Sequence, residues 1–425
     1  MTTAAKLARS TFRALRVRNY RLFFAGQIVS VSGTWMQSVA QAWLVLRLTG
    51  SGAALGLIIA LQTLPILIGG AYGGVIADRV DKRRMLYATQ AAAAALALTL
   101  GLLTLTGLVQ LWLVGGLALG LGLVNMVDIP TRQSFVQEMV GREDLTNAIS
   151  LNSVIMNGAR IVGPALAGVL IATVGIAVCF LVNAASYLAV LAGLWAMRGP
   201  ELNRVTPGHR SPGQLLEGLR YVWRRPELRT PLLMMAVVGC FAFEFTVSLP
   251  LLARFTFHTG AQGFGAMSSV FGVGAVGGGL LTAALGRPTG RRLVLAGLAF
   301  GALILLTAMA PTFPLTLALL AATGATGMAF AALANSTIQL SADPGMRGRV
   351  MALYAVAFMG STPIGGPIVG WVGQSISPRA ALGLGGVATI LAALAAYRSL
   401  AGARPQAVSP ETHRLPQAGA QAGAV

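Results

Sequence analysis

Two ionisable residues lie inside long apolar stretches of the sequence, where a charge is costly. Glu244 falls within the stretch 231–256, and Arg160 falls within 147–173. Each lies about 13 residues into its stretch, or roughly 20 Å at 1.5 Å per helical residue, so both are expected near the middle of a bilayer. A charge there costs about 2.5–3.5 kcal/mol on insertion scales and usually marks an ion or proton pathway. We therefore predict that Glu244 and Arg160 take part in proton coupling.

The relation between these two residues stays open at this stage. An unpaired Glu244 could load and unload a proton near neutral pH, as a proton carrier must. If Arg160 pairs with Glu244, the carboxylate is favoured, and substrate or a conformational change must break the pair. A static polar contact is the third interpretation. Beside Glu244, Phe241, Phe243 and Phe245 either line an apolar pocket or contact lipid.

Polar side chains of the apolar stretch 22–47 fall close to one helical face. They are Gln27, Ser30, Gln37 and Gln41, with Trp35 nearby. Such a stripe suits a water-lined cavity, although hydrogen bonds between packed helices are the commoner explanation in membranes. Together with Asn157 in the fifth stretch, these residues are the candidates for a substrate cavity.

Long apolar stretches position all of these residues. Hydrophobic residues make up 55% of the 425-residue chain and charged residues only 10%. About twelve stretches reach the roughly 20 residues that a membrane-spanning helix needs, and they are far longer than barrel strands. The predicted fold is an all-α polytopic membrane protein with two pseudo-symmetric six-helix bundles. The spans are 22–47, 53–77, 86–107, 111–133, 147–173, 176–197, 231–256, 263–286, 292–310, 313–338, 350–374 and 380–400.

The basic residues predict the orientation. Most of the 31 Lys and Arg residues lie in alternate gaps between the spans, starting with the N-terminal arm. The positive-inside rule then places both termini in the cytoplasm, with the protein in the cytoplasmic (inner) membrane. The net charge of +19 is spread over short loops, which favours contact with lipid headgroups over nucleic acid. Three histidines and two cysteines suggest neither a metal site nor a cofactor.

The halves of the chain resemble each other. Gly163-Pro164 recurs as Gly366-Pro367, about 203 residues later, and repeats of this kind are typical of transporters with a site between the halves. A polar segment separates the halves, and its part 214–225 is expected to form a short amphipathic surface helix. The predicted organisation is a cytoplasmic arm (1–21), an N-terminal bundle (22–197), a cytoplasmic central loop (198–230), a C-terminal bundle (231–400) and a disordered cytoplasmic tail (401–425).

The loop after the second span carries Gly74, Asp78, Arg79, Lys82 and Arg83 at specific spacing. A glycine allows close approach of helices, and a carboxylate at a helix end can accept hydrogen bonds from an opposing helix N-terminus. A solvated cluster that only sets topology is the simpler interpretation. The spacing resembles the Gly-x-x-x-Asp-Arg-x-Gly-Arg-Lys loop of the major facilitator superfamily, except that Asp81 replaces the second Gly. That resemblance implies a gating latch, in which Asp78 caps the start of the eleventh span and a basic loop residue pairs with Asp128.

Further stretches resemble one branch of that superfamily. The segments 33–45 and 128–133 are similar to the branch of enterobactin exporters and macrolide efflux proteins. This implies export of small molecules in exchange for protons, and the substrate could be a drug, a siderophore or a metabolite. The fifth span resembles the Gly-Pro motif of antiporter branches, in which a hinge is expected. Its residues are Gly158, Gly163, Pro164 and Gly168, with Gly366 and Pro367 as counterparts.

Other classes of protein fit less well. An ATP-driven pump or another nucleotide enzyme would need a Gly-x4-Gly-Lys-[Ser/Thr] phosphate loop. This sequence has no such loop, because its only lysines are Lys6 and Lys82. A channel would be expected to show a selectivity filter, commonly built from several subunits. A facilitator or importer without proton exchange and a non-transporting receptor or scaffold remain as alternatives. We expect a monomer in the lipid bilayer whose partners are a small-molecule substrate and protons.

Overall fold

The computed structural model describes residues 12–203, 214–284 and 288–401. Residues 402–425, for which disorder is predicted, lie outside these ranges. The regular structure within them is helical. The N-terminal half contains α2 (Arg18–Thr49), α3 (Gly52–Arg79), α4 (Lys82–Leu105), α5 (Leu111–Val140), α6 (Leu145–Thr173) and α7 (Ile176–Ala196), with short turns at η1 (Arg13–Arg16) and η2 (Gly199–Glu201).

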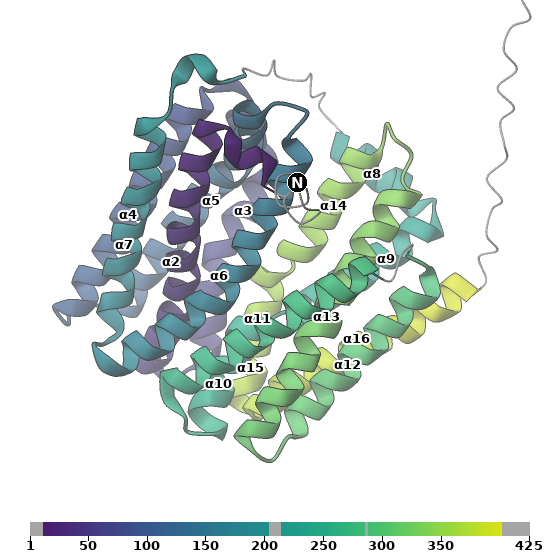
Figure 1. Ribbon diagram of the computed structural model, residues 1–425. Coiled ribbons are helices and arrows are strands. Elements are labelled where there is room, and N and C mark those ends of the chain that lie inside the picture. Colours follow the sequence, from purple (N-terminus) through teal and green to yellow (C-terminus); the bar gives the residue numbers. More distant parts are fainter. Residues whose placement is uncertain (1–11, 204–213, 285–287, 402–425) are drawn as a thin grey trace, which may run out of the picture.

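The C-terminal half begins after a surface helix, α8 (Gln214–Trp223), which confirms the helix predicted in the central loop. It contains α9 (Pro226–Phe241), α10 (Phe245–Leu251), η3 (Leu252–Thr256), α11 (Gly260–Ala284), α12 (Gly290–Met309), α13 (Phe313–Ser341), α14 (Arg347–Met359), α15 (Thr362–Ser375) and α16 (Pro378–Ala401). Figure 1 shows the two halves as separate bundles, purple to teal and green to yellow.

Eleven segments of the described ranges are long and apolar enough to cross a membrane. Helix α2 is not among these eleven segments, because it carries more polar side chains and is less apolar. It is nevertheless 32 residues long and packs against α6 and α7. These eleven segments and α2 make the twelve helices predicted. The fold class predicted from sequence is confirmed.

Two of the spans are broken near their middle. The seventh span ends as α9 at Phe241 and restarts as α10 at Phe245, so Glu244 stands at the break. The eleventh span ends as α14 at Met359 and restarts as α15 at Thr362. Pro363 lies in the first turn of α15, a position where a missing N–H is tolerated. Discontinuous helices of this kind commonly border the binding site of a transporter.

The bundles pack together through glycines of antiparallel helices. A Cβ on Gly56 of α3 would overlap the carbonyl oxygen of Gly366 in α15, and Gly370 lies as close to Gly52. On the other side of the interface, Gly265 of α11 packs on α6. Small residues let helices approach closely where the bilayer supplies no hydrophobic drive for association. We call the end of the molecule that holds Gly52 and Gly370 the closed end.

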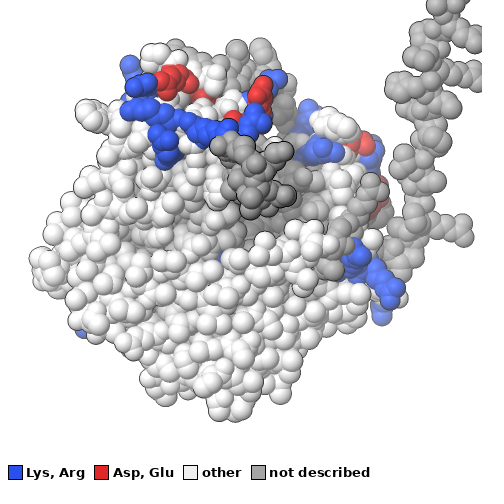
Figure 2. Space-filling view, in the orientation of Figure 1, with Lys and Arg blue, Asp and Glu red and all other residues white. Residues whose placement is uncertain are grey.

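The opposite end carries most of the charge of the described residues. Figure 2 shows Lys, Arg, Asp and Glu gathered along the upper and right-hand rim, beside a surface that is largely free of charge in this view. We call it the charged end. The apolar band below it has the character expected of a lipid-facing surface.

Candidate functional site

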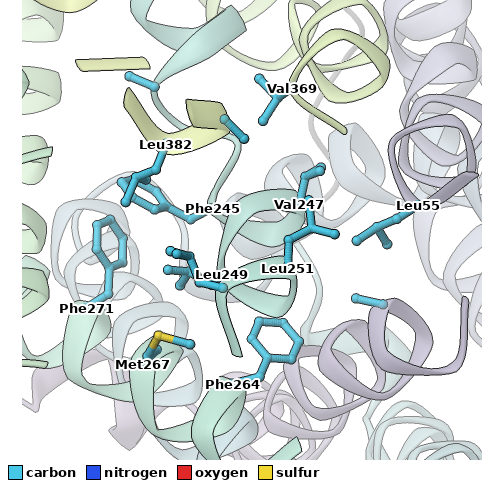
Figure 3. Packing of buried hydrophobic residues seen from close by; sticks show 14 of the residues in the cluster. Leu55, Phe245, Val247, Leu249, Leu251, Phe264, Met267, Phe271, Val369 and Leu382 are labelled. Carbon is cyan, nitrogen blue, oxygen red and sulfur yellow. The ribbon is translucent and has the colours of Figure 1, made fainter. Parts of the chain in front are cut away.

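A cavity lies between the two bundles. Its wall comes from α2, α6, the broken seventh span and α11, so both halves of the chain contribute. Figure 3 shows Phe245, Phe264 and Phe271 grouped around Leu249. The cavity is lined by Trp35, Ser38, Val39, Arg160, Pro164, Phe243, Phe245, Thr246, Leu249, Phe264, Ser268 and Phe271.

Arg160 lines this cavity and stacks on Trp35. Its guanidinium carbon lies 4.9 Å from the centroid of the Trp35 ring, within the range of a cation–π interaction. Among the described residues, no carboxylate forms an ion pair with Arg160. The ion pair with Glu244, which the sequence left open, is therefore absent from this conformation.

Glu244 occupies the crossing of the two helix breaks. Its side chain is 3% exposed, and the hydroxyl of Thr362 is a hydrogen-bond partner of its carboxyl group. Oε2 lies 3.7 Å from the position that a Cβ on Gly366 would take, so the glycine leaves room for the carboxyl. Oε1 has no hydrogen-bond partner among the described residues. A buried polar atom without a partner is uncommon in native structures.

The polar residues of α2 serve mainly to join helices of the N-terminal bundle. The Gln41 amide donates to Gln62 Oε1 at 2.9 Å, and Asn183 donates to Gln37 Oε1 at 2.6 Å. The prediction of a cavity stripe is not met in this conformation, because these amides and Gln27 find partners within the bundle. Of the predicted cavity residues, Trp35 lines the cavity. Ser30 is buried, and the Asn157 amide donates to the carbonyl of Ser153 in its own helix.

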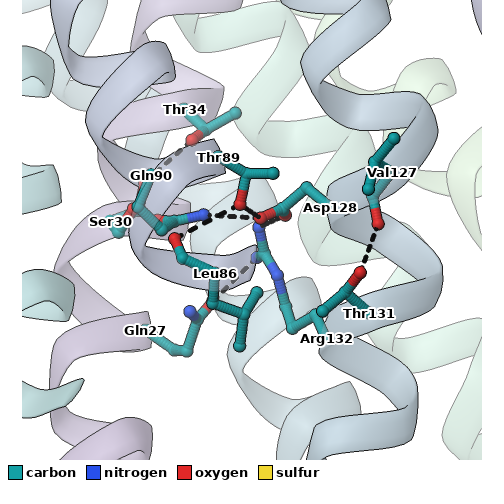
Figure 4. Close-up of polar contacts among 10 residues, drawn as sticks. All are labelled: Gln27, Ser30, Thr34, Leu86, Thr89, Gln90, Val127, Asp128, Thr131 and Arg132. Carbon is teal, nitrogen blue, oxygen red and sulfur yellow. Dashed lines mark hydrogen bonds and ion pairs between the residues drawn. The ribbon is translucent and has the colours of Figure 1, made fainter. Parts of the chain in front are cut away.

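A polar network surrounds Asp128 of α5 (Figure 4). The carboxylate is 1% exposed and accepts hydrogen bonds from Thr89 Oγ1 at 2.7 Å and Gln90 Nε2 at 2.9 Å. Its remaining oxygen forms an ion pair with Arg132, one turn away on the same helix. Arg132 also donates to Gln27 Oε1 at 2.8 Å. The buried charge of Asp128 is thus matched by three partners.

The basic loop makes contacts other than the ones that the resemblance implied. Asp128 pairs with Arg132 and not with a loop residue, because Lys82 is taken by Glu138, with Nζ 2.6 Å from Oε1. Arg83 donates to the carbonyls of Leu194 and Trp195 at 3.0 and 3.2 Å. The remaining predicted members are a buried Gly74, an exposed Arg79, and Asp78, whose side chain lies outside the described part.

The predicted hinge glycines differ in their surroundings. A Cβ on Gly163 would press against the Cβ of Trp35 and the carbonyl of Ser32, so this glycine fits α6 tightly to α2. Gly168 lies near α11 of the other bundle. A Cβ on Gly158 would meet no atom within 4 Å, so this glycine is not needed for close helix packing in this conformation. Pro164 lines the cavity, and Pro367 contacts Gly56 next to Gly366.

Polar contacts that were not predicted from the sequence hold the closed end together. Gln374 Oε1 of α15 accepts from Ser51 Oγ at 2.6 Å and from the Ala53 N–H at 3.2 Å. It therefore caps the N-terminus of α3, which belongs to the other bundle. Arg254 donates in turn to the carbonyl of Leu46 near the C-terminus of α2 at 2.5 Å.

Other cavity residues were also missed. Phe264, Ser268 and Phe271 of α11 recur at the spacing of one helical face, which is the signal that could have identified them. By contrast, Phe243 and Phe245 line the cavity, in agreement with the predicted apolar pocket and not with the alternative of lipid contact.

Two helical bundles around a central cavity bordered by broken helices define a secondary transporter. Residues 9–418 match the model of the family described as transmembrane secretion effector. The chain belongs to this family, and it is a transporter of the major facilitator superfamily, not an enzyme.

Curated relatives are named as efflux and siderophore transporters. The multidrug efflux pump Tap of Mycolicibacterium fortuitum is 26% identical over 357 residues, which cover 81% of this chain and 86% of the relative. The staphyloferrin A transporter of Staphylococcus aureus is 28% identical over 265 residues, covering 60% and 64%. The enterobactin exporter EntS of Citrobacter koseri is 23% identical over 381 residues, covering 88% and 90%.

Solved transporter structures share the fold. The nucleoside transporter NupG superposes with a TM-score of 0.70 at 12% identity, covering 91% of this chain and 98% of the other. A bacterial homologue of the human lysosomal transporter Spinster, in an inward-facing and unoccupied conformation, gives 0.67 at 14% identity, covering 90% and 96%. At such low identity these matches support the fold alone.

Proposed function

We propose that this protein exports small molecules across the bacterial cytoplasmic membrane in exchange for protons, by alternating access of the central cavity. The observation that carries the proposal is Glu244, a carboxyl buried at the crossing of two helix breaks with one oxygen lacking a partner among the described residues. A proton removes the charge that the membrane interior disfavours, and release of that proton requires a change of surroundings.

The position of Glu244 ties its protonation to movement. Its surroundings come from α10 and from the N-terminus of α15, where Thr362 and Gly366 lie. Helix α15 also packs on α3 of the other bundle through Gly366 and Gly56. Any sliding of α15 against α3 therefore changes what surrounds the carboxyl. This is the coupling that an antiporter needs between proton binding and the bundle interface.

The closed end suggests which state is seen. If the charged end faces the cytoplasm, as the positive-inside rule predicts, the contacts of Gln374 and Arg254 seal the outer side. The conformation would then be inward-facing. In the outward-facing state we propose that the closed end separates and the loop of Gly74, Asp78, Arg79, Lys82 and Arg83 latches the charged end. Both termini would lie in the cytoplasm, and the protein would act as a monomer.

The names of two relatives support export, since they describe a multidrug efflux pump and an enterobactin exporter. A facilitator or importer without proton exchange, and a receptor or scaffold of this fold, are the alternatives. Substrate-dependent proton movement across the membrane of sealed vesicles, opposite in direction to the substrate, separates a proton antiporter from all three.

The test begins with a survival screen, which compares cells with and without the protein against many toxic compounds. A compound whose toxicity is reduced is then used in inside-out vesicles with an imposed pH gradient. Glu244→Gln should abolish gradient-driven uptake into these vesicles while leaving folding and compound binding intact. Glu201→Gln is the matched control, because Glu201 is exposed and pairs with Arg198 at the charged end. Unimpaired transport by Glu244→Gln would remove Glu244 from the mechanism.

A further inference from the structure

Among the described residues that line the cavity, Arg160 is the one that carries a charge. The nearest acidic residue along the seventh span, Glu244, is directed toward α15 and does not line the cavity. Within the described ranges, Arg160 has the Trp35 ring but no carboxylate as its partner. The cavity wall therefore presents a net positive charge.

A guanidinium in the membrane interior normally finds an anionic partner or a water-filled cavity. The Trp35 face attracts the cation, but a ring quadrupole carries no net charge and is weaker than a carboxylate partner. Arg160 stays charged at any physiological pH and can bind a planar anion through two parallel N–H groups. A ligand that brings a negative charge would complete the pairing that the protein leaves open.

The rest of the wall is suited to an apolar ligand body. Phe243 and Phe245 contribute aromatic rings from the seventh span, and Phe264 and Phe271 face them from α11. The Phe245 and Phe271 ring centroids lie 4.4 Å apart. Ser268 adds a hydroxyl that can donate to an oxygen anion. A few polar groups on an otherwise apolar wall are typical of small-molecule sites.

We propose that the cavity binds amphiphilic organic anions, which join an aromatic or apolar body to one carboxylate or similarly acidic group. The acidic group pairs with Arg160, and the apolar body lies against the phenylalanines. This inference rests on the proposed transport function, since it assigns a substrate class to the same cavity. Organic cations of the same size are disfavoured, because they would face the guanidinium.

The experiment is equilibrium binding to the purified protein in detergent, with three probes that share one ring system. The probes are 2-naphthoate, 2-naphthylmethanol and 2-naphthylmethylammonium, which are anionic, neutral and cationic at pH 7. Wild-type protein should bind the anion at least tenfold more tightly than either of the others. Tighter or equal binding of the cation, or no binding of the anion, would overturn the proposal.

Variants test whether Arg160 is the cause. Arg160→Gln should lose about tenfold in affinity for 2-naphthoate, the equivalent of one lost charge-assisted contact, with little change for the neutral alcohol. Arg160→Lys keeps the charge and should recover part of the loss, which also guards against a folding defect. Arg47→Gln alters an exposed arginine and should bind as wild type does. An undiminished anion preference in Arg160→Gln would contradict the assignment.

The binding assay is independent of proton coupling, because no gradient is present. Glu244→Gln should therefore keep the preference for the anion. If anion preference is intact but transport shows no proton dependence, the proposed antiport fails and the substrate class stands. If transport is proton-dependent but the probes show no anion preference, the proposed substrate class fails and the proposed antiport stands.

Discussion

The two bundles each bury a carboxylic acid, and they treat it in opposite ways. In the N-terminal bundle, Asp128 accepts from Thr89 and Gln90 and pairs with Arg132. In the C-terminal bundle, Glu244 has Thr362 as a hydrogen-bond partner, and its other oxygen has none among the described residues. A buried charge with a full set of partners is fixed in place, whereas one with few partners is free to take up a proton.

This difference suggests a division of labour between the bundles. The hydrogen bonds of Gln27, Gln37 and Gln41 join helices of the N-terminal bundle, which should move as one body. The breaks lie in the seventh and eleventh spans, both in the C-terminal bundle. Helix breaks remove backbone hydrogen bonds and supply points at which a helix can bend. We therefore expect the conformational change to be concentrated around Glu244.

The largest expected effect comes from removing the charge of Asp128. Asp128→Asn removes the buried carboxylate and leaves the partly buried Arg132 without its counter-ion, which should destabilise the protein by at most about 3 kcal/mol, the lower end of the cost of breaking a fully buried pair. Glu244→Gln removes a carboxyl that has no cationic partner within the described ranges, and it should change stability far less. Thermal unfolding of the two purified variants in detergent measures both. Equal losses of stability would show that the partners of Asp128 stabilise the folded protein no more than the surroundings of Glu244 do.

The tight fit of α6 against α2 gives the next largest effect. Gly163→Ala places a methyl group against Trp35 and Ser32 and should cost about 1–3 kcal/mol through overpacking. Gly158→Ala, one turn and a half earlier in the same helix, meets open space and should be neutral or slightly stabilising, since Ala favours helix by about 0.8–1.0 kcal/mol over Gly. Unfolding temperatures distinguish them. Similar behaviour of the two variants would refute the tight intrabundle packing.

The contacts of the closed end should have a moderate effect on the balance between states. Gln374→Ala removes hydrogen bonds to Ser51 and Ala53, each worth about 0.5–1.5 kcal/mol, and so should shift the population toward separation of this end by roughly tenfold. Spin labels at Leu48→Cys and Ile376→Cys, which replace exposed side chains, report the distance across this end in a background without Cys179 and Cys240.

Gln339→Ala provides the control for that measurement. Gln339 is exposed and donates to Asn335 within α13, so its loss should leave the distance distribution unchanged. An unchanged distribution in Gln374→Ala as well would show that the capping contacts do not hold the closed end.

The smallest effect is expected at the surface. The Arg225 guanidinium, with the Tyr221 hydroxyl, holds the pKa of Asp343 below its usual value. A carboxyl whose pKa is lowered by folding stabilises the folded state above its unfolded pKa, and this contribution is lost as the pH falls through the folded pKa. Asp343→Asn should therefore lower the unfolding temperature slightly at pH 7 and not at acidic pH. A larger effect at acidic pH would contradict the sign.

The sequence predicted much of the fold because apolar length and charge placement are properties of the chain alone. The spans, the helix α8 and the duplicated Gly-Pro segments could all be predicted in this way. The break at Ala242–Glu244 could not, because neither glycine nor proline stands at those positions. Pro363 was available as a signal for the second break.

The site was predicted in part. Arg160, Trp35 and Pro164 were named from sequence and line the cavity. The amides of Gln37 and Gln41 were assigned to the cavity, since a sequence shows that a face is polar but not which neighbouring helix supplies the partner. For the same reason Gln374 could not be found: its role depends on a helix N-terminus in the other half of the chain.

The most direct test of the central claim is an infrared pH titration of the carboxylic acid carbonyl band in the purified protein. Wild type should show a buried, protonated carboxyl that disappears as the pH is raised. We predict that this band is absent from Glu244→Gln and retained in a folded Asp128→Asn. A band that persists unchanged in Glu244→Gln, or one that vanishes in Asp128→Asn, would contradict the account.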